Sequence, residues 1–290
     1  MAQIDTESPE ESGVEDISEY ESVLIGAAMD LVGAMAAVFG GDFVDPLGAL
    51  LPKITKYYSP ARSSTDRGAA MGSLGEIIVG MKQAITPLTG EVSRGRGSTA
   101  PAQWLTPFFL NQLLTTLSRA LQDEEAAVRS NAAFASGCLI EYTQTDLSEH
   151  FPALLNAIRP MFTPAAADER EEISNARDNA CGCLSRMILR KQDAVPLEQA
   201  LPILLSSMPL KRDFAEWTPV LQCFMTLLQA NHGAAMTHVD AILQLFAHVL
   251  ADADEPLDAK TRGQLVGFVS SLNAQAPEKI QAAGLQPYLV

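Results

Sequence analysis

The sequence is short of positive charge. Lysine and arginine together number 20 against 35 aspartate and glutamate residues, so the formal net charge is −15 at neutral pH. A nucleic-acid binder needs basic residues to displace counterions from phosphate groups, so the charge argues against that class of function. An acidic surface attracts basic partners and steers their approach, although the same charge also serves solubility alone.

Aromatic residues are also scarce. They make up 6% of a chain that is 47% hydrophobic, and leucine and alanine dominate the apolar share. Both residue types lose little side-chain freedom in a helix, and no segment shows the sustained period-two alternation of a strand. The composition therefore predicts an all-α protein.

Cysteine and the usual catalytic motifs are few or missing. All four cysteines (Cys138, Cys181, Cys183, Cys223) lie inside apolar helical patterns, and the acidic N-terminal segment lacks the basic region of a signal peptide. We expect reduced, buried thiols in a protein of the cytoplasm and nucleus. No cysteine or histidine group has zinc spacing, and there is no G-x-S-x-G, H-E-x-x-H or P-loop motif. The sequence thus predicts no metal, no cofactor and no enzymatic activity.

The longest apolar run covers 23–39 and contains Asp30 together with several glycines and alanines. An acidic segment precedes it, with Glu15, Asp16, Glu19 and Glu21. These charges favour a buried helix over a membrane span, and we expect no membrane partner.

Helical patterns follow one another along nearly the whole chain. We expect a disordered acidic lead-in over 1–16 and one solenoid domain of about six repeats over 17–290. A segment rich in glycine and proline at 86–101 predicts a flexible inserted loop. The expected helices cover 17–39, 45–58, 64–85, 103–121, 124–142, 147–162, 172–190, 197–208, 214–231, 237–251, 258–273 and 277–288.

An internal repeat carries the fold prediction. Arg129-Ser130-Asn131-Ala132 matches Arg177-Asp178-Asn179-Ala180 after 48 residues, and Arg67-Gly68-Ala69-Ala70 is an earlier copy. Between the copies, a Leu-Pro or Phe-Pro pair opens an apolar run at 51–52, 151–152 and 201–202, and we expect these prolines in or near first helical turns. A unit of two helices in about 40 to 50 residues is typical of HEAT or armadillo repeats. We therefore predict a HEAT-repeat α-solenoid, a right-handed superhelix of antiparallel helix pairs, in which the repeated arginines form a ladder with acids of neighbouring turns.

The candidate binding residues lie on the second helices, which we expect to line the concave face. Asparagine and acidic side chains there could hold lysine or arginine from an extended peptide, and a tryptophan could add an aromatic face for the cation. Helix stacking and capping are the alternative roles, and for the tryptophan a place in the core is the favoured one. The residues are Asn131, Asp178, Asn179, Asp213, Glu216 and Trp217.

Two stretches carry a resemblance to a known family. Arg177-Asp178-Asn179-Ala180-Cys181-Gly182 and the run from Met208 to Glu216, together with the preceding repeat at 128–135, resemble the C-terminal HEAT-repeat region of β-karyopherins, the importin-β superfamily. Within that superfamily the similarity is to the importin four branch, of fungal type. It is clear from about residue 123 onward and rests on general pattern before that.

The resemblance implies the cargo-binding portion of a nuclear import receptor that shuttles through the nuclear pore. Its partners would be basic cargo such as core histones or ribosomal proteins, with Ran and nucleoporins binding the full-length receptor. The family's asparagine maps onto Asn179 and its acidic pair onto Ala215-Glu216, where Ala215 replaces an acid and Arg212 adds a positive charge. The alternative is a HEAT scaffold subunit that binds a folded protein and is not a transport receptor.

Overall fold

The computed structural model describes residues 9–82, 107–162, 170–252 and 257–289, and every regular element within these ranges is a helix. The expected inserted loop at 86–101 lies outside the described residues. The described helices match the sequence prediction within a few residues at most ends. Short 3₁₀ turns take up part of three of the expected helices, at Ser148–His150 and Arg159–Phe162, at Phe214–Glu216 and at Gln286–Tyr288.

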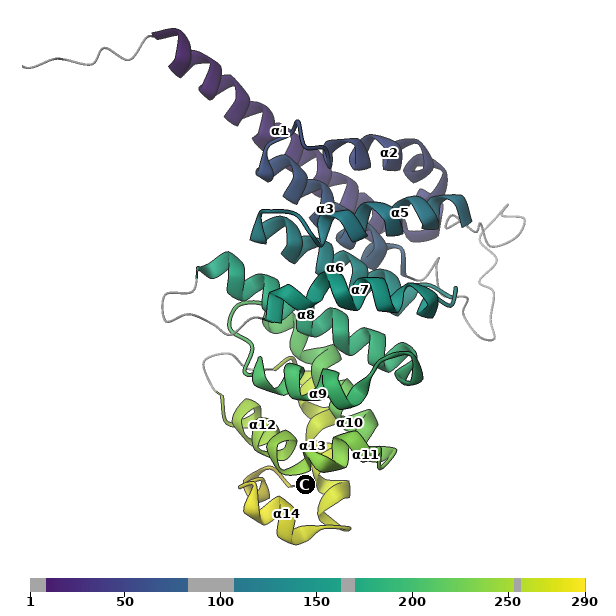
Figure 1. Cartoon of the computed structure of the whole chain (residues 1–290), viewed down its shortest axis with the longest axis vertical. Coiled ribbons are helices and arrows are strands. Elements are labelled where there is room, and N and C mark those ends of the chain that lie inside the picture. The colour runs from purple at the N-terminus through teal and green to yellow at the C-terminus, as the bar shows by residue number, and fades with distance from the viewer. Residues whose placement is uncertain (1–8, 83–106, 163–169, 253–256, 290) are drawn as a thin grey trace, which may run out of the picture.

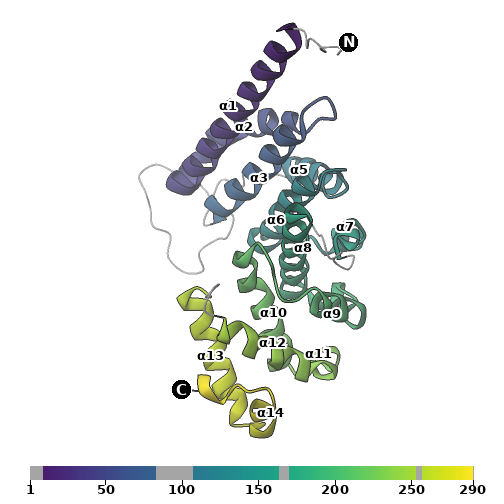
Figure 2. The same cartoon turned by 90° about the vertical axis from the view of Figure 1, so that its left-hand side faces the viewer.

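The helices form two layers. The inner layer consists of α1 (Pro9–Phe39), α3 (Ser64–Gly80), α6 (Ala126–Tyr142), α8 (Glu171–Arg190), α10 (Trp217–Gln229) and α13 (Ala259–Asn273). The outer layer consists of α2 (Val44–Tyr57), α5 (Pro107–Ala120), α7 (Phe151–Ile158), α9 (Leu197–Ser206), α11 (Gly233–Thr237) and α12 (Val239–Ala251), and α14 (Pro277–Ala282) follows at the C-terminal end. Each inner helix contacts the next one along the chain (Figure 1). Figure 2 shows the inner helices on the concave side of the stack and α5, α7 and α9 on the convex side. The predicted HEAT-type solenoid is confirmed.

Small residues let the inner helices approach closely. Ala132, Ala135, Ala176 and Ala180 are buried, so α6 and α8 pack backbone against backbone. Gly80 shows the tightest approach to the backbone of another helix, since a Cβ atom there would lie 2.6 Å from the Ala37 backbone nitrogen of α1. A core built this way is apolar and continuous, and it runs between the layers from one repeat to the next.

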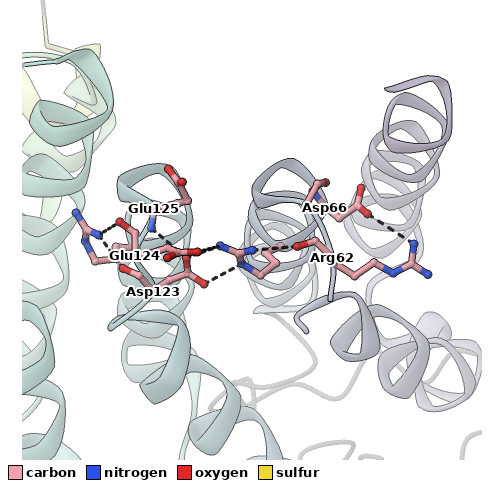
Figure 3. Close-up of polar contacts among 8 residues, drawn as sticks. Arg62, Asp66, Asp123, Glu124 and Glu125 are labelled. Atoms are coloured by element: carbon pink, nitrogen blue, oxygen red, sulfur yellow. Dashed lines mark hydrogen bonds and ion pairs between the residues drawn. The ribbon is translucent and has the colours of Figure 1, made fainter. Parts of the chain in front are cut away.

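A charged contact joins neighbouring repeats at their turns. The Arg67 guanidinium on α3 donates from Nε and Nη2 to the two carboxylate oxygens of Asp123, at 3.0 and 2.8 Å. The Glu124 carboxylate also approaches the Arg67 guanidinium, at 3.6 Å. The Glu125 amide donates to Asp123, and Figure 3 shows these three acidic residues side by side in the turn. Burial raises the pKa of Asp123, but the bonds from Arg67 and the Glu125 amide outweigh it and hold the pKa below its usual range.

One step of the predicted arginine ladder is therefore present. Arg129 donates to the backbone oxygens of Asp123 and Glu124 in its own turn, at 2.7 and 2.8 Å, and within the described residues no ion pair joins it to a neighbouring repeat. Its role is to close the turn before α6, while Arg67 makes the contact between repeats.

The first helix differs from its prediction in two ways. It begins at Pro9, so residues 9–16, expected to be disordered, are helical. Proline at the first position and glutamates after it are favourable at a helix start, and the lead-in prediction gave this too little weight. The helix is also buried on one side only: Met29 and Ala36 face α3, whereas an opposite stripe of Tyr20, Leu24, Leu31 and Val38 is 53 to 77% exposed.

Length and composition alone would allow the segment Tyr20–Tyr57 to cross a membrane. A 3₁₀ turn at Gly40–Phe43 divides it, and α2 on its far side packs into the solenoid core through Leu47, Leu51 and Ile54. The segment is built into the stack as two helices.

Two prolines lie deeper in their helices than expected. Pro152 is in the first turn of α7, but Pro52 and Pro202 are inside α2 and α9. Both rings are exposed, where the backbone carbonyl left without its helical partner can bond to water.

Candidate functional site

The predicted site residues cluster where α8 meets the segment that leads into α10, and most of them are buried. Asp178 is 1% exposed, and one of its carboxylate oxygens accepts the backbone N–H groups of Lys211, Arg212 and Asp213, at 2.8, 2.6 and 3.0 Å. Burial raises the pKa of Asp178, while these three bonds oppose the rise. Asp178 thus anchors the turn before α10.

Asn179 links two repeats. Its amide nitrogen lies 3.2 Å from the Ser130 hydroxyl on α6 and 3.0 Å from the Asp213 carboxylate, and it also approaches the Asn175 carbonyl at 3.2 Å. The residue is 3% exposed, and its buried side-chain oxygen has no hydrogen-bond partner among the described residues. The unusual mid-helix asparagine therefore already has internal contacts, which the sequence could not distinguish from a ligand contact.

Glu216 forms a buried ion pair. Its carboxylate contacts the Arg186 guanidinium, whose Nε also donates to Glu141 at 2.7 Å. Glu216 is 1% exposed and Arg186 8% exposed. Burial raises the pKa of Glu216 to about 7, with the attraction of Arg186 acting against the rise. Two carboxylates raise the pKa of Arg186 overall although burial lowers it, so the guanidinium stays charged.

Gly182 makes room for this pair. A Cβ atom on Gly182 would lie 1.5 Å from Glu216 Oε2 and 2.8 Å from Arg186 Nη1. No side chain fits at this position while the pair is intact. The glycine in the Asn-Ala-Cys-Gly stretch is thus explained by the acid that comes 34 residues later.

Trp217, the first residue of α10, is 4% exposed and belongs to the hydrophobic core, the alternative that the sequence favoured. Burial corrects the site prediction for four residues. Asp178, Asn179, Glu216 and Trp217 hold the wall of the solenoid together and do not present their polar groups to a partner.

Asn131 and Asp213 remain partly exposed. The Asn131 amide donates to the Gly68 carbonyl at 2.9 Å, and its side chain lines a hollow of about 470 Å³ at the N-terminal ends of α6 and α8. Glu171, Glu172 and Arg212 line the same hollow, and Arg212 lies 3.6 Å from Glu171. The hollow is lined by two carboxylates, but that of Glu171 is already paired with the Arg212 guanidinium.

A larger hollow of about 540 Å³ lies on the concave face across α3, α6, α8 and α10. Two carboxylates line it, Glu76 from α3 and Glu141 from α6. Glu76 is exposed and has no ion-pair partner within the part of the chain that the structure describes. The Glu141 side chain is 39% exposed beyond its contact with Arg186. Of the cations in this hollow, Arg186 is held by two carboxylates and Arg190 donates to the Thr143 carbonyl at 2.7 Å.

Sequence reasoning missed Glu76 and Glu141. Glu76 comes nine residues after Arg67, and Glu141 comes twelve after Arg129. Both lie in the second halves of their helices, whereas the repeated arginines and asparagines that suggested a site lie nearer the helix starts. The 3.6-residue helical period could have identified them, because it places both glutamates on the side of the helix opposite to the residues that pack against the outer layer.

Metal or nucleophilic chemistry finds little support in the described ranges. No group of three or more histidine, cysteine, aspartate and glutamate residues there could hold a metal ion. All four cysteines are free and buried, as expected, and burial raises their thiol pKa values, that of Cys183 to about 12. Thiols of this kind are unreactive at neutral pH.

The chain is similar to importins over nearly its whole length. Probable importin subunit beta-4 of Schizosaccharomyces pombe is 32% identical over 275 residues, which cover 95% of this chain and 23% of that protein. Importin-4 of Homo sapiens is 30% identical over 92% of this chain and 22% of its own length, and Importin-4 of Mus musculus is 28% identical over 84% and 20%. No protein-family model matches the chain.

The resemblance to a region of importin four is thereby confirmed, and it extends through the first hundred residues, where the sequence pattern alone was weak. The chain spans less than a quarter of the length of these relatives.

Proposed function

We propose that this chain is a cargo-binding portion of a nuclear import receptor, and that it holds basic segments of its cargo on the concave face. Cargo of this kind includes core histones and ribosomal proteins. The chain acts by binding and is not an enzyme. A full-length receptor containing it would shuttle between cytoplasm and nucleus, with Ran and nucleoporins as its further partners.

One observation carries the proposal, namely the pair of accessible carboxylates in the concave hollow. Glu76 and Glu141 face the same space, while both arginines that line it are engaged with internal acceptors. A lysine or arginine entering the hollow would meet the exposed Glu76 carboxylate, which has no ion-pair partner among the described residues, and the exposed part of the Glu141 carboxylate, which Arg186 already contacts. Charge-assisted hydrogen bonds to carboxylate are the strong ones. The net charge of −15 would steer basic segments toward the protein from a distance.

The test is calorimetric binding of a lysine-rich histone-tail peptide at two salt concentrations. Glu76→Lys should weaken binding about tenfold at low salt, since it replaces one attraction with a repulsion of similar size. Glu198→Lys is the matched control, because Glu198 is an exposed glutamate on the outer helix α9 and the variant has the same net charge. Equal weakening by both variants, or no binding of the peptide to the unmodified protein, would refute the proposal.

A scaffold that binds a folded protein is the second candidate. The exposed apolar stripe of α1 is the observation that favours it, because a stripe of that size suits a folded surface better than a basic peptide. Peptide-independent capture of a folded partner through α1 would support this candidate.

A further inference from the structure

A second hollow adjoins the acidic one on the concave face. It has a volume of about 420 Å³ and lies across α8, α10 and α13. Leu189 and Gln222 line both hollows, so together they form one continuous groove across the inner helices. The groove therefore extends well beyond the two carboxylates.

The two halves of the groove differ in chemistry. None of the residues that line the second hollow is charged. Its walls combine apolar surface from Leu189, Met225 and Phe268 with the amide side chains of Gln222, Gln229 and Gln264. Leu189 is 36% exposed, which is unusual for a leucine on an otherwise buried helix.

This lining suits an extended peptide that carries an apolar side chain. Glutamine side chains both donate and accept hydrogen bonds, so they can pair with the N–H and C=O groups of a peptide backbone. Leu189 offers most of the exposed apolar surface, and the edges of Met225 and Phe268, which are 7 and 8% exposed, border it. Such a surface gains from covering by another apolar group. A lysine placed here would lose water without meeting a carboxylate.

We infer that the groove recognises a bipartite segment, with basic residues in the half formed by Glu76 and Glu141 and a large apolar residue in the half formed by Leu189, Met225 and Phe268. This inference rests on the proposed function and adds a specificity to it. Neighbouring packed helices lie about 8 to 10 Å apart, so the path from α6 past α8 to α10 is roughly 20 Å. An extended chain covers roughly 3.3 Å per residue, which places the apolar residue about six positions from the basic cluster.

Gly267 offers a clean way to test the second hollow. It is exposed, it lines the hollow, and a Cβ atom there would meet nothing within 4 Å. Gly267→Tyr should fill the hollow without disturbing the core, and replacing a helical glycine favours the helix. Gly48→Tyr is the matched control, because Gly48 is an exposed glycine in the outer helix α2 with the same free space.

Four synthetic peptides complete the experiment, and their binding to the full chain is followed by fluorescence anisotropy. The first carries three lysines and, six positions away, a leucine; the others replace the leucine with alanine, the lysines with glutamine, or both. The lysine and leucine peptide should bind about tenfold more tightly than the lysine and alanine peptide, and Gly267→Tyr should abolish that difference while Gly48→Tyr retains it.

The outcomes separate the two proposals. If both lysine peptides bind with equal affinity, or if Gly267→Tyr leaves the leucine preference intact, the bipartite inference is wrong and the basic-cargo proposal stands. If neither lysine peptide binds better than its glutamine counterpart, the proposed function fails and the inference fails with it.

Discussion

Gly182→Ala is the sharpest perturbation that the buried ion pair allows. The new methyl carbon would lie 1.5 Å from Glu216 Oε2 and 2.3 Å from its Cδ, so the carboxylate must move away. Glu216 and Arg186 are both buried, and the motion separates them in a medium that cannot replace the lost contact. The single methyl group thus forces the Glu216 carboxylate away from the Arg186 guanidinium.

The expected magnitude follows from two opposing effects. Breaking a buried ion pair so that one charge is left without its partner costs about 3 to 5 kcal/mol. Replacing glycine with alanine inside a helix contributes about 1 kcal/mol in the other direction. We expect a net loss of about 2 to 4 kcal/mol in the free energy of unfolding, from a substitution that ordinarily stabilises a helix.

Urea unfolding followed by tryptophan fluorescence measures this loss. Trp217 is buried directly after Glu216, and a Trp104→Phe background makes it the sole reporter. Gly267→Ala is the control, because the space around Gly267 is open and the same exchange there should stabilise the protein by up to about 1 kcal/mol.

A double-mutant cycle decides the cause. In a Glu216→Ala background the carboxylate is absent, so Gly182→Ala should cost nothing there. A loss of the same size in both backgrounds would refute the ion-pair explanation. An unchanged or raised stability for Gly182→Ala alone would refute it as well.

Two further expectations concern the acid stability of the chain and its association. The pKa of Asp123 is below its unfolded value, so this carboxylate stabilises the fold above about pH 4, and the contribution is lost as the pH falls through the folded pKa. In urea unfolding, Asp123→Asn should lower the free energy of unfolding by about 2 kcal/mol at pH 7 and by progressively less in acid. The control Asp240→Asn, in the exposed pair with Lys279, should lower it by under about 1 kcal/mol. A pH-independent difference at Asp123 would contradict this account. The exposed stripe on α1 should drive concentration-dependent self-association in sedimentation, and Leu31→Lys should abolish it, since the residues of the stripe are four or seven positions apart and so lie on one face of the helix, as in a helix-pairing seam. A monomer at all concentrations would show that the stripe does not associate.

Much of the fold could be predicted because its signals are local. Helical periodicity and the punctuation by glycine and proline fix each helix within its own segment, and the recurrence of Arg-x-Asn-Ala fixes the repeat. The predicted start of α1 and the predicted positions of Pro52 and Pro202 within their helices were wrong, although these features also depend on nearby residues. Helix ends are the least certain local feature, because a capped and an uncapped end differ by about 1 kcal/mol.

The site was predicted less well because burial depends on contacts between distant segments. Asp178 and Asn179 look like available polar groups on a second helix until the segment at 211–213 folds over them, and that segment lies more than 30 residues away in the sequence. Gly182 was the one clue, since a glycine in mid-helix implies a close neighbour. The accessible carboxylates, Glu76 and Glu141, lie about two to three helical turns beyond Arg67 and Arg129, the first residues of the repeated motifs.

The buried polar network bears on how binding experiments should be interpreted. The inner helices meet through alanine, glycine and cysteine, and such smooth faces pack well in more than one register. Asn179 bridging Ser130 and Asp213, and Arg186 bridging Glu141 and Glu216, fix one register, which is a recognised role of buried polar groups. A substitution at Asn179 or Glu216 would therefore shift the wall that carries Glu76 and Glu141. Under the proposed function it would weaken the binding of a basic peptide without any lost contact to that peptide. Only a variant that weakens binding at unchanged stability, as we expect for Glu76→Lys, identifies a residue that touches the partner.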